Sequence, residues 1–459
     1  MRNLFKKIVV WKLDHLAKIY LWRFKPEIIA VTGNVGKTST KEAIACVLKK
    51  VKRVRSGKGN LNNEFGVPLT ILGDWSDDYY EAGNSGWFWF RVFMATPFGL
   101  FSRNYPEVLV LEYGADRPGD IARLAEKYKP KIGIITAVGE IPVHIEYFSD
   151  PDGLAKEKSK LISKMDSSCY AILNHDDPAV YDMKERTKAR VMSYGFTAHL
   201  KDKNTDVTED SMNLGEAMVK LSNLDFRFDS DGRPMGIGFK IHHGNNASFV
   251  PVILHDILGR SQALAAGAAA AVGIIYGMNL IEISQALVDY QGPKGRLKIL
   301  KGIRNSVIID DTYNAAPAST HLAIETLKDL VTFRRAQSRT TRSLAVLGDM
   351  LELGKYTVQA HQEMGNLVGG HVDILVTVGL RAKFIADSAE NQMSKENIYS
   401  FTTSDLAKIK IQELIEEGDL ILVKGSQGAR MEKIVEEIMA EPERKRELLV
   451  RQGKKWLKN

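Results

Sequence analysis

Residues 28–40 read IIAVTGNVGKTST, and this stretch decides the fold. Its first four residues are apolar and mostly β-branched, which indicates a buried strand, and the run KEAIACVLKK that follows favours a helix. A strand that passes through a glycine turn into a helix is the context of a phosphate-binding loop. The general spacing of such loops would put their first glycine at the position of Val31. We therefore predict a nucleotide site, against the alternative of a chance glycine turn.

The residue types of this loop suit phosphate chemistry. Glycines let backbone N–H groups close around phosphate oxygens, and the helix N-terminus adds its positive dipole end. Lys37 can reach the terminal phosphates, and the hydroxyl of Thr38 can ligate Mg²⁺. The predicted nucleotide-binding residues of the loop are Gly33, Asn34, Val35, Gly36, Lys37, Thr38 and Ser39.

Composition limits the class of protein. A chain of 459 residues with 44% apolar and 26% charged residues is typical of a soluble protein of two or three domains. The net charge of +7 suits anionic small molecules or anionic lipid headgroups, but it is too diffuse to argue for nucleic acid. Cys46 and Cys169 form no CxxC pair, so neither a zinc site nor a disulfide framework is indicated. We expect a cytoplasmic protein.

Two segments carry unusual numbers of aromatic residues. Residues 1–27 are basic and place apolar residues at helical spacing, which predicts an amphipathic helix. This helix either packs on the following domain, the interpretation we favour, or lies peripherally on an anionic membrane with the help of Trp11 and Trp22. Residues 87–101, WFWFRVFMATPFGLF, predict a helix that is buried or half-buried; an exposed version would bind lipid or a partner.

Further apolar runs alternate with helical patterns. The predicted strands Val108–Leu111, Ile132–Ala137 and Ala171–Leu173 indicate a parallel sheet, in which ligands gather at the carboxyl ends of the strands. The polar, alternating residues 196–250 favour an antiparallel β insertion, and the Ala-rich run Ala263–Met278 favours a tightly packed helix.

A domain boundary is predicted near Gln291. Beyond it four more strands with intervening helices are expected, at Ser306–Ile309, Leu344–Leu347, Ile374–Val378 and Leu420–Val423. The predicted fold is α/β, with a central P-loop parallel-sheet ATPase domain at 28–291 that contains the β insertion. A smaller Rossmann-like α/β domain follows at 292–459.

Several polar residues follow the predicted strands. Glu112 ends one strand, and His144 follows the next closely. Each alone would more often be structural, but beside a P-loop they form a plausible metal shell with Thr38. Lys158 lies in a predicted helix from Gly153 to Ser163, where the ordinary interpretation is a solvated basic face.

The ordered set of motifs resembles the Mur ligase family, and within it the branch that adds D-alanyl-D-alanine. The motifs run from TGNVGKTSTKE through GNLNNEFGVPLTIL, LEYGADRPGDIARL, ITAVGEIPVHIEYF and LNHDDP to GPKGR, DDTYNAAP, LGDMLELG and LVKGSQGARMEKIV. The resemblance implies an ATP-dependent amide ligase of peptidoglycan precursor synthesis. In that reaction, ATP converts the carboxylate of a muramoyl peptide into an acyl phosphate, which the amine of D-Ala-D-Ala attacks.

The resemblance also implies roles for individual residues. Catalysis would rest on Lys37, Glu112, His144 and Lys158. Two Mg²⁺ ions would be held by Thr38, Glu112, His144 and a carbamylated Lys158. Arg296 and Asp311 would face the nucleotide from the second domain, and the substrates would contact Asn62, Asn63, Asp349, Lys424 and Ser426.

The chain departs from the family pattern at several positions. Ser261, Gln262 and Ala265 replace a His-Asn…Asn set, Ala316 replaces the second Asn of YNANP, and Gln427 replaces the Arg of KGSR. The family also carries a UDP-sugar-binding domain before the P-loop, where only 27 residues precede the strand in this sequence. Two alternatives therefore stay open: a ligase for another acyl substrate, such as a poly-glutamate or folate-like one, and a non-catalytic membrane-associated scaffold.

Overall fold

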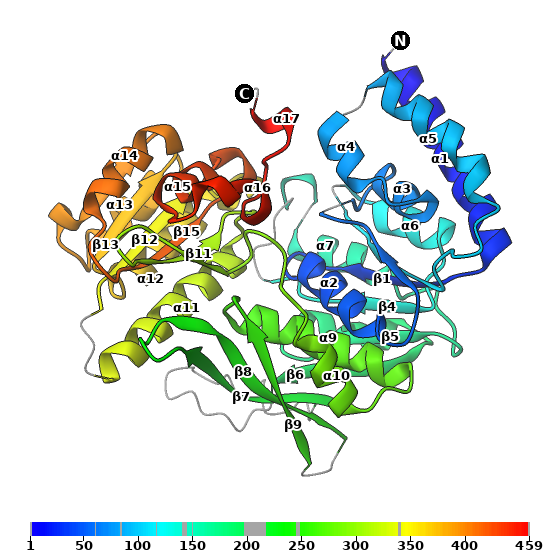
Figure 1. Ribbon diagram of the computed structural model, residues 1–459, viewed down its shortest axis with the longest axis horizontal. Coiled ribbons are helices and arrows are strands. Elements are labelled where there is room, and N and C mark those ends of the chain that lie inside the picture. The colour runs from blue at the N-terminus through cyan, green and yellow to red at the C-terminus, as the bar shows by residue number, and fades with distance from the viewer. Residues whose placement is uncertain are drawn as a thin grey trace.

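The computed structural model describes residues 2–59, 61–82, 85–115, 117–139, 145–148, 150–196, 217–244, 248–337 and 341–457. The chain forms two α/β parts, each built around its own sheet, and both ends of the chain lie on the same side of the molecule (Figure 1). The predicted α/β class is confirmed.

The described residues of the first part form a nine-stranded sheet in the order β2-β3-β1-β4-β5-β6-β7-β8-β9. The strand before the P-loop is central in its parallel section, since β1 pairs with β3 on one side and β4 on the other. The strands are β1 Glu27–Thr32, β2 Val54–Ser56, β3 Val108–Glu112, β4 Ile132–Ile135, β5 Tyr170–Asn174, β6 Arg190–Phe196, β7 Val219–Phe228, β8 Pro234–His243 and β9 Phe249–His255.

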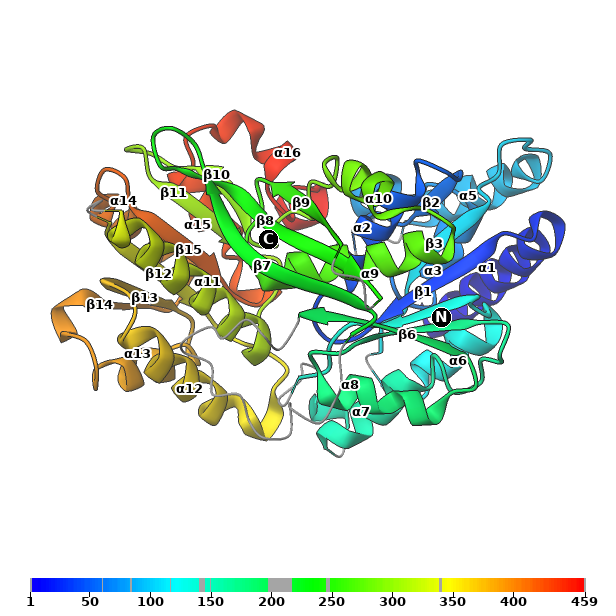
Figure 2. The same ribbon diagram turned by 90° about the horizontal axis from the view of Figure 1, so that it is seen from below.

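The predicted β insertion is confirmed as antiparallel strands but extends the main sheet. β7, β8 and β9 pair antiparallel with one another, and β7 also pairs in parallel with β6 (Figure 2). The section of the prediction from 197 to 216 lies outside the described residues. The strands at this end have an exposed face, which explains their alternating polar pattern: β9 alternates between buried and exposed side chains toward its end.

The sheet is covered on both faces. Alternate residues of β1 point to opposite sides, so Ile29 and Val31 join a core with helices α2, α9 and α10, while Ile28 and Ala30 join a core with α1, α3, α5 and α6. The helices of this part are α1 Arg2–Phe24, α2 Lys37–Leu48, α3 Gly66–Leu72, α4 Ser76–Ala82, α5 Gly86–Gly99, α6 Asp120–Lys127, α7 Pro151–Ser159, α8 Pro178–Tyr181, α9 Arg260–Ile275 and α10 Leu280–Leu287.

The N-terminal helix α1 packs on the first part, as we favoured from the sequence. Leu13 and Tyr20 are fully buried, and the Tyr20 hydroxyl donates a hydrogen bond of 2.5 Å to the carbonyl of Thr96 in α5. Asp14 accepts a hydrogen bond from the Tyr128 hydroxyl and pairs with a lysine at the end of α6. Only residues 25–26 separate α1 from β1, so the helix is held directly against the sheet.

The described residues of the second part form a six-stranded sheet in the order β10-β11-β15-β12-β13-β14, parallel except for β10. Its strands are β10 Lys298–Lys301, β11 Val307–Asp311, β12 Ser343–Gly348, β13 Ile374–Val378, β14 Ile398–Phe401 and β15 Leu420–Lys424. Its helices are α11 Pro317–Ala336, α12 Thr357–Gly369, α13 Lys383–Ala389, α14 Ser404–Leu414, α15 Glu432–Ile438, α16 Lys445–Leu448 and α17 Lys454–Leu457. The short α17 reaches back to contact α4 of the first part (Figure 1).

No helix in the described ranges is long and apolar enough to cross a membrane. The Ala-rich run is the buried helix α9, as predicted, and its alanines and glycines allow close approach to α2 and to the sheet. At Gly273, for example, a Cβ atom would lie less than 3 Å from the side chain of Ile283, so a larger residue would not fit without a shift.

Candidate active site

The loop between β1 and α2 has the geometry that a phosphate-binding loop requires. Gly33 and Gly36 adopt positive φ angles of 143° and 87°, which side chains disfavour. A Cβ on Gly33 would stand 2.1 Å from the hydroxyl oxygen of Thr136, so this position accepts only glycine. Gly36 caps the N-terminus of α2, whose positive dipole end faces the loop.

Thr38, at the start of α2, and Asn62, in the loop before α3, both form hydrogen bonds with Glu112 at the end of β3. The Thr38 hydroxyl donates a hydrogen bond of 2.9 Å to Oε2 of Glu112, and the Asn62 amide donates one of 3.0 Å to Oε1. Glu112 is 3% exposed, so both carboxylate oxygens are held in a fixed direction in a buried place. The sequence prediction that Thr38 and Glu112 share one site is consistent with this contact.

This arrangement fits a Mg²⁺ ion. Mg²⁺ prefers hard oxygen ligands, commonly one or two carboxylates together with phosphate oxygens and water. Thr38 and Glu112 supply a hydroxyl and a carboxylate at the mouth of the P-loop. The predicted partner His144 lies outside the described residues, and among the described ones no three His, Cys, Asp or Glu side chains gather as a complete metal shell.

Lys37 turns back on its own loop. Its Nζ donates hydrogen bonds to the carbonyls of Gly33 at 2.8 Å and Asn34 at 3.3 Å, which keeps the ammonium over the loop. The structure therefore places the Lys37 ammonium at the P-loop, and its predicted contact with phosphates stays a prediction.

The second part of the chain closes the other side of this site. A cavity beside the P-loop is lined by Lys37, Thr38, Asn62 and Glu112 from the first part, and by Arg296, Tyr313, Asn314 and Ser319 from the region after residue 292. The Arg296 guanidinium lies 4.2 Å from the centre of the Tyr313 ring, a cation–π contact that orients it. The structure therefore places Arg296 in the same cavity as the P-loop, and its expected contact with a nucleotide stays a prediction.

Asp311 and Lys424 form a buried ion pair at the carboxyl ends of β11 and β15. Nζ of Lys424 lies 2.6 Å from Oδ2 of Asp311, and it also donates a hydrogen bond of 3.0 Å to the carbonyl of Asn314. Burial raises the pKa of the Asp311 carboxyl and lowers that of the Lys424 ammonium, while each charge favours the ionised form of the other. Asp311 lines a cavity that also reaches Gly36, so this end of the pair lies beside the P-loop.

Asp349 and Ser426 hold the second sheet together locally. Asp349 accepts hydrogen bonds from the backbone N–H groups of Arg381 and Ala382, at 2.9 and 2.7 Å. The Ser426 hydroxyl donates to the carbonyl of Ala315 and accepts from the backbone of Leu351. Neither residue lines the cavity beside the P-loop, so their predicted substrate contacts stay predictions.

Lys158 does not lie on a solvated face. It is 2% exposed, whereas Lys156 on the same helix α7 is exposed. The ordinary interpretation of this run as a solvated basic face is wrong for Lys158. Asn63 also differs from Asn62: its side-chain oxygen accepts hydrogen bonds of 3.1 Å from the N–H groups of Phe65 and Gly66 and so supports the start of α3.

Two residues to which the sequence analysis gave no role, Lys41 and Gln262, support the site. Lys41 is buried one helical turn after Lys37, and its Nζ donates to the carbonyls of Gly57 and Gly59 in the loop that carries Asn62. Gln262 is one of the departures from the family pattern, and its side-chain amide donates a hydrogen bond of 2.8 Å to the carbonyl of Arg296. Lys41 lies in the quoted P-loop motif and Gln262 at a position that departs from the family pattern, but the partners of both are distant in sequence and leave no local signal.

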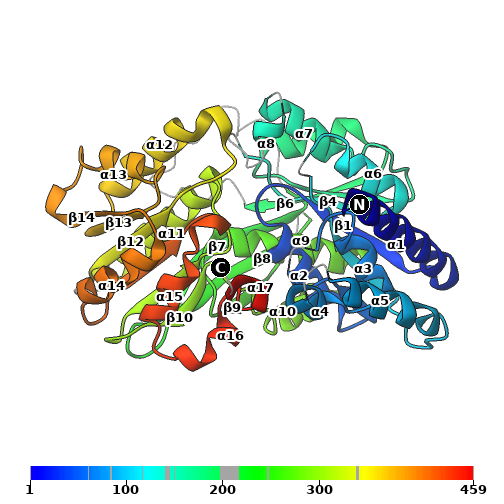
Figure 3. The same ribbon diagram turned by 90° about the horizontal axis from the view of Figure 1, so that it is seen from above.

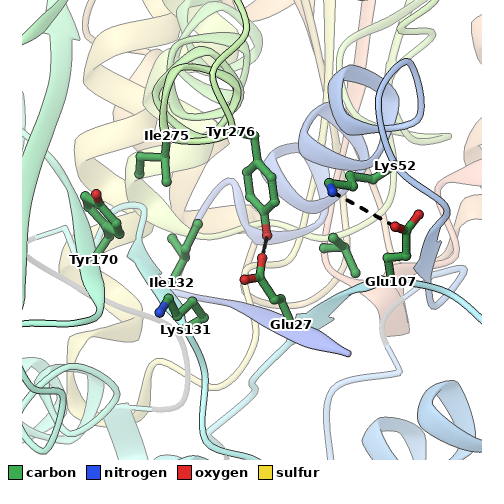
Figure 4. A pocket seen from close by; sticks show the side chains of 9 residues that line it. Glu27, Lys52, Glu107, Lys131, Ile132, Tyr170, Ile275 and Tyr276 are labelled. Carbon is green, nitrogen blue, oxygen red and sulfur yellow. Dashed lines mark hydrogen bonds and ion pairs between the residues drawn. The ribbon is translucent and has the colours of Figure 1, made fainter. Parts of the chain in front are cut away.

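A larger cavity, of about 460 Å³, lies at the opposite, amino edge of the first sheet (Figure 4). Its polar wall includes Glu27, which accepts a hydrogen bond of 2.6 Å from the Tyr276 hydroxyl, and Glu107, which is near Lys52. It lies away from the P-loop, because β1 runs from this edge toward the loop. We assign the candidate site to the smaller cavity, because the buried carboxylate and the P-loop lie there.

Known proteins share this sequence and architecture. Residues 97–232 match the Mur ligase middle domain, and residues 295–427 match the glutamate ligase domain of Mur ligases. The UDP-N-acetylmuramoyl-tripeptide–D-alanyl-D-alanine ligase of Bacillus subtilis is 28% identical over 94% of this chain and 79% of its own length. The enzyme of the same name from Mycobacterium leprae is 31% identical over 87% of this chain and 71% of its own length.

A solved structure shows the same fold. The MurF ligase of Thermotoga maritima, crystallised in complex with ADP, aligns with a TM-score of 0.70 and 24% identity over 95% of this chain and 84% of its own. The two matched domains and the Mycobacterium relative lead to one conclusion: the chain belongs to the Mur ligase family, whose members are ATP-dependent ligases that form amide bonds.

Proposed function

We propose that this chain is the ligase that joins D-Ala-D-Ala to the carboxylate of a muramoyl peptide in the synthesis of peptidoglycan precursors. The observation that carries the proposal is the cavity in which the P-loop, the buried Glu112 and Arg296 from the second part face one another. The names of the relatives in Bacillus and Mycobacterium supply the substrates.

In this proposal the P-loop binds the phosphates of ATP. The backbone N–H groups around Gly33 and Gly36 and the N-terminus of α2 face the phosphate oxygens, while Lys37 leaves its loop carbonyls to contact the terminal phosphates. Arg296, held over Tyr313, adds a positive charge from the opposite wall, with Asp311 nearby. These fixed charges stabilise the negative charge that develops during phosphoryl transfer.

The acyl substrate is proposed to approach along Asn62 and Asn63. Its carboxylate would lie close to Glu112 and the terminal phosphate, where attack on the γ-phosphorus of ATP forms an acyl phosphate, breaks the bond to the bridging oxygen and releases ADP. The amine of D-Ala-D-Ala then attacks the acyl carbon, and phosphate leaves. Lys424, Asp349 and Ser426 are the residues of the second part that we propose for the dipeptide side.

Two Mg²⁺ ions and a carbamylated Lys158 are further elements of the proposal. Thr38 and Glu112 would hold one ion, and His144 together with the carbamate of Lys158 the other; the ions would neutralise phosphate charge. The burial of Lys158 supports this, because a carbamate converts a buried ammonium into an anion that can bind a metal.

We also propose that the protein is cytoplasmic and makes peripheral contact with the membrane through residues 1–27. Helix α1 is packed on its inner face, yet Trp11 and Trp22 are 64% and 75% exposed. Large apolar side chains on a basic helix are typical of contact with a lipid surface.

The test is phosphate release by the full chain with ATP, Mg²⁺, D-Ala-D-Ala and a muramoyl tripeptide, offered with and without UDP. We expect release only when both substrates are present, and a product heavier by the dipeptide. Lys37→Ala should abolish release, whereas Lys301→Ala, an exposed lysine of the second part, should not. Release that requires glutamate in place of the dipeptide would favour the poly-glutamate or folate-like alternative, and no release with any acceptor would favour the scaffold.

A further inference from the structure

Helices α1 and α5 lie next to each other over one face of the first sheet (Figure 3). They are joined by the hydrogen bond from Tyr20 to Thr96, and the Lys12 ammonium lies 5.4 Å from the centre of the Phe93 ring. Their inner residues share one core, so the two helices form a single packed layer.

The outer side of this layer is strongly apolar. In α5 the side chains of Phe88, Trp89 and Val92 are buried, whereas the large apolar side chains on the opposite side of the helix are exposed. Phe98 and Trp87 are 76% and 68% exposed. The exposed large apolar residues of the layer are Leu4, Phe5, Ile8, Trp11, Trp22, Trp87, Phe90, Met94, Phe98 and Phe101, which we call the α1/α5 surface.

The helices of the α1/α5 surface carry mostly positive charges, although Lys6 pairs with Glu64 and Arg91 with Asp78 of α4. Helix α1 carries six Lys or Arg residues and a single acidic residue, Asp14, whose carboxylate is turned inward to Tyr128. Helix α5 contains Arg91 and no acidic residue. The surface is therefore apolar and cationic, which complements an anionic lipid bilayer.

The same helix also borders the candidate substrate site. Asp14 and Lys127 line a small cavity together with Asn62 and Asn63. Asn62 donates a hydrogen bond to Glu112 and lines both this cavity and the cavity beside the P-loop, so the two cavities adjoin at Asn62. One face of α1 thus bounds the proposed path of the acyl substrate, and its other face belongs to the α1/α5 surface.

We propose that the α1/α5 surface docks the enzyme on an anionic membrane, and that the acyl substrate is a muramoyl peptide anchored in that membrane. This rests on the proposed ligase function and names its substrate class. A second copy of the chain is the poorer occupant, because self-association would bring two cationic surfaces together.

Docking is tested by sedimentation of the full chain with vesicles that contain phosphatidylglycerol or only phosphatidylcholine, at low and high salt. We expect binding to anionic vesicles at low salt. Lys7→Gln/Lys18→Gln should weaken it roughly fivefold per lysine, and Trp87→Ser/Phe98→Ser roughly tenfold or more. The matched controls lie on the second part: Lys301→Gln/Lys383→Gln for charge and Leu380→Ser/Leu406→Ser for exposed apolar area. These controls should bind like the unchanged protein.

The substrate class is tested by turnover of one muramoyl tripeptide in two forms, free in solution and coupled to a lipid anchor in anionic vesicles. We expect faster turnover of the anchored form, and the two surface variants should lose this advantage while they keep turnover of the free form. Equal loss in the control variants, or no binding to anionic vesicles, would overturn docking.

The remaining outcomes separate the two proposals. Docking without preference for the anchored peptide would overturn the substrate class alone. Turnover of neither form would overturn the ligase proposal, while sedimentation would still report on docking. Analytical ultracentrifugation tests whether the chain forms a dimer. A dimer that the Trp87→Ser/Phe98→Ser variant abolishes would show that a second copy covers the α1/α5 surface, and it would overturn the proposal of membrane docking.

Discussion

Removing the buried ammonium of Lys424 should loosen the second sheet. In Lys424→Met the partner Asp311 stays buried without its charge partner, since the two side chains are 1% and 7% exposed. At 2.6 Å and an effective dielectric constant of about 20, their attraction is about 6 kcal/mol, part of which offsets desolvation. Breaking a buried pair from one side costs about 3–5 kcal/mol.

Hydrogen-exchange mass spectrometry on β11 and β15 measures this loss where it occurs, without mixing the stabilities of the two parts. We expect exchange on the order of 10²–10⁴-fold faster in these strands. The control Lys395→Met breaks an exposed pair with Glu390, 3.5 Å apart, and should change exchange little. The double variant Lys424→Met/Asp311→Leu should recover most of the protection, because an apolar pair replaces the ionic one.

Two results would refute the reasoning. Unchanged exchange in Lys424→Met would mean that the pair contributes nothing to the sheet. Full ligase activity in the double variant would mean that Lys424 and Asp311 are structural only, and their proposed substrate and nucleotide roles would be wrong.

Three further predictions concern Glu112 and Lys158 of the candidate site and the buried Asp310 of β11. Glu112→Gln keeps the side-chain shape but removes the charge that would hold Mg²⁺, so phosphate release at saturating Mg²⁺ should fall by a factor on the order of 10² or more with unchanged thermal stability; near-normal release would make Glu112 structural. Lys158→Ala should be inactive and partly rescued by short carboxylates that replace the carbamate, and the mass of active enzyme should show the carbamate; an unmodified lysine in active enzyme would contradict the proposal. Burial raises the pKa of Asp310 from 3.8 to about 6, so the protonated form stabilises the fold below pH 4 and this contribution disappears as the pH rises through 6. The stability of Asp310→Asn relative to the unchanged protein should therefore rise by up to about 3 kcal/mol between pH 4 and pH 7.5 in urea unfolding, and a constant difference would refute the raised pKa.

The sequence predicted the central strands well, because strands buried on both faces read as short apolar runs. β13 has the predicted bounds, and β1, β3 and β5 differ by at most one residue at each end. The edge strands β2, β10 and β14 and the inner strand β6 were missed, so the second sheet has six strands where four were expected. β2 has only three residues, VRS, and β14 has no fully buried residue, so neither shows the pattern of a core strand.

The site was predictable where one segment or one sheet edge defines it. The P-loop and the meeting of Thr38 with Glu112 follow from strands that end at the same edge. The burial of Lys158 could not be predicted from the residues alone, because the side of a helix that becomes covered depends on its neighbours in space. The role of Gln262 in holding Arg296 likewise depends on how the two parts pack.

The two-residue connection between α1 and β1 has a mechanical consequence. A docked enzyme has no flexible tether at this point, because α1 is packed against the sheet and continues almost directly into the strand that carries the P-loop. The active site would stay at a fixed height and tilt above the lipid, and the enzyme would search for its substrate by diffusion in two dimensions. A flexible insert between Phe24 and Glu27 would leave the binding of α1 to lipid intact but spread the active site over a range of heights, and turnover of anchored substrate would fall with the length of the insert.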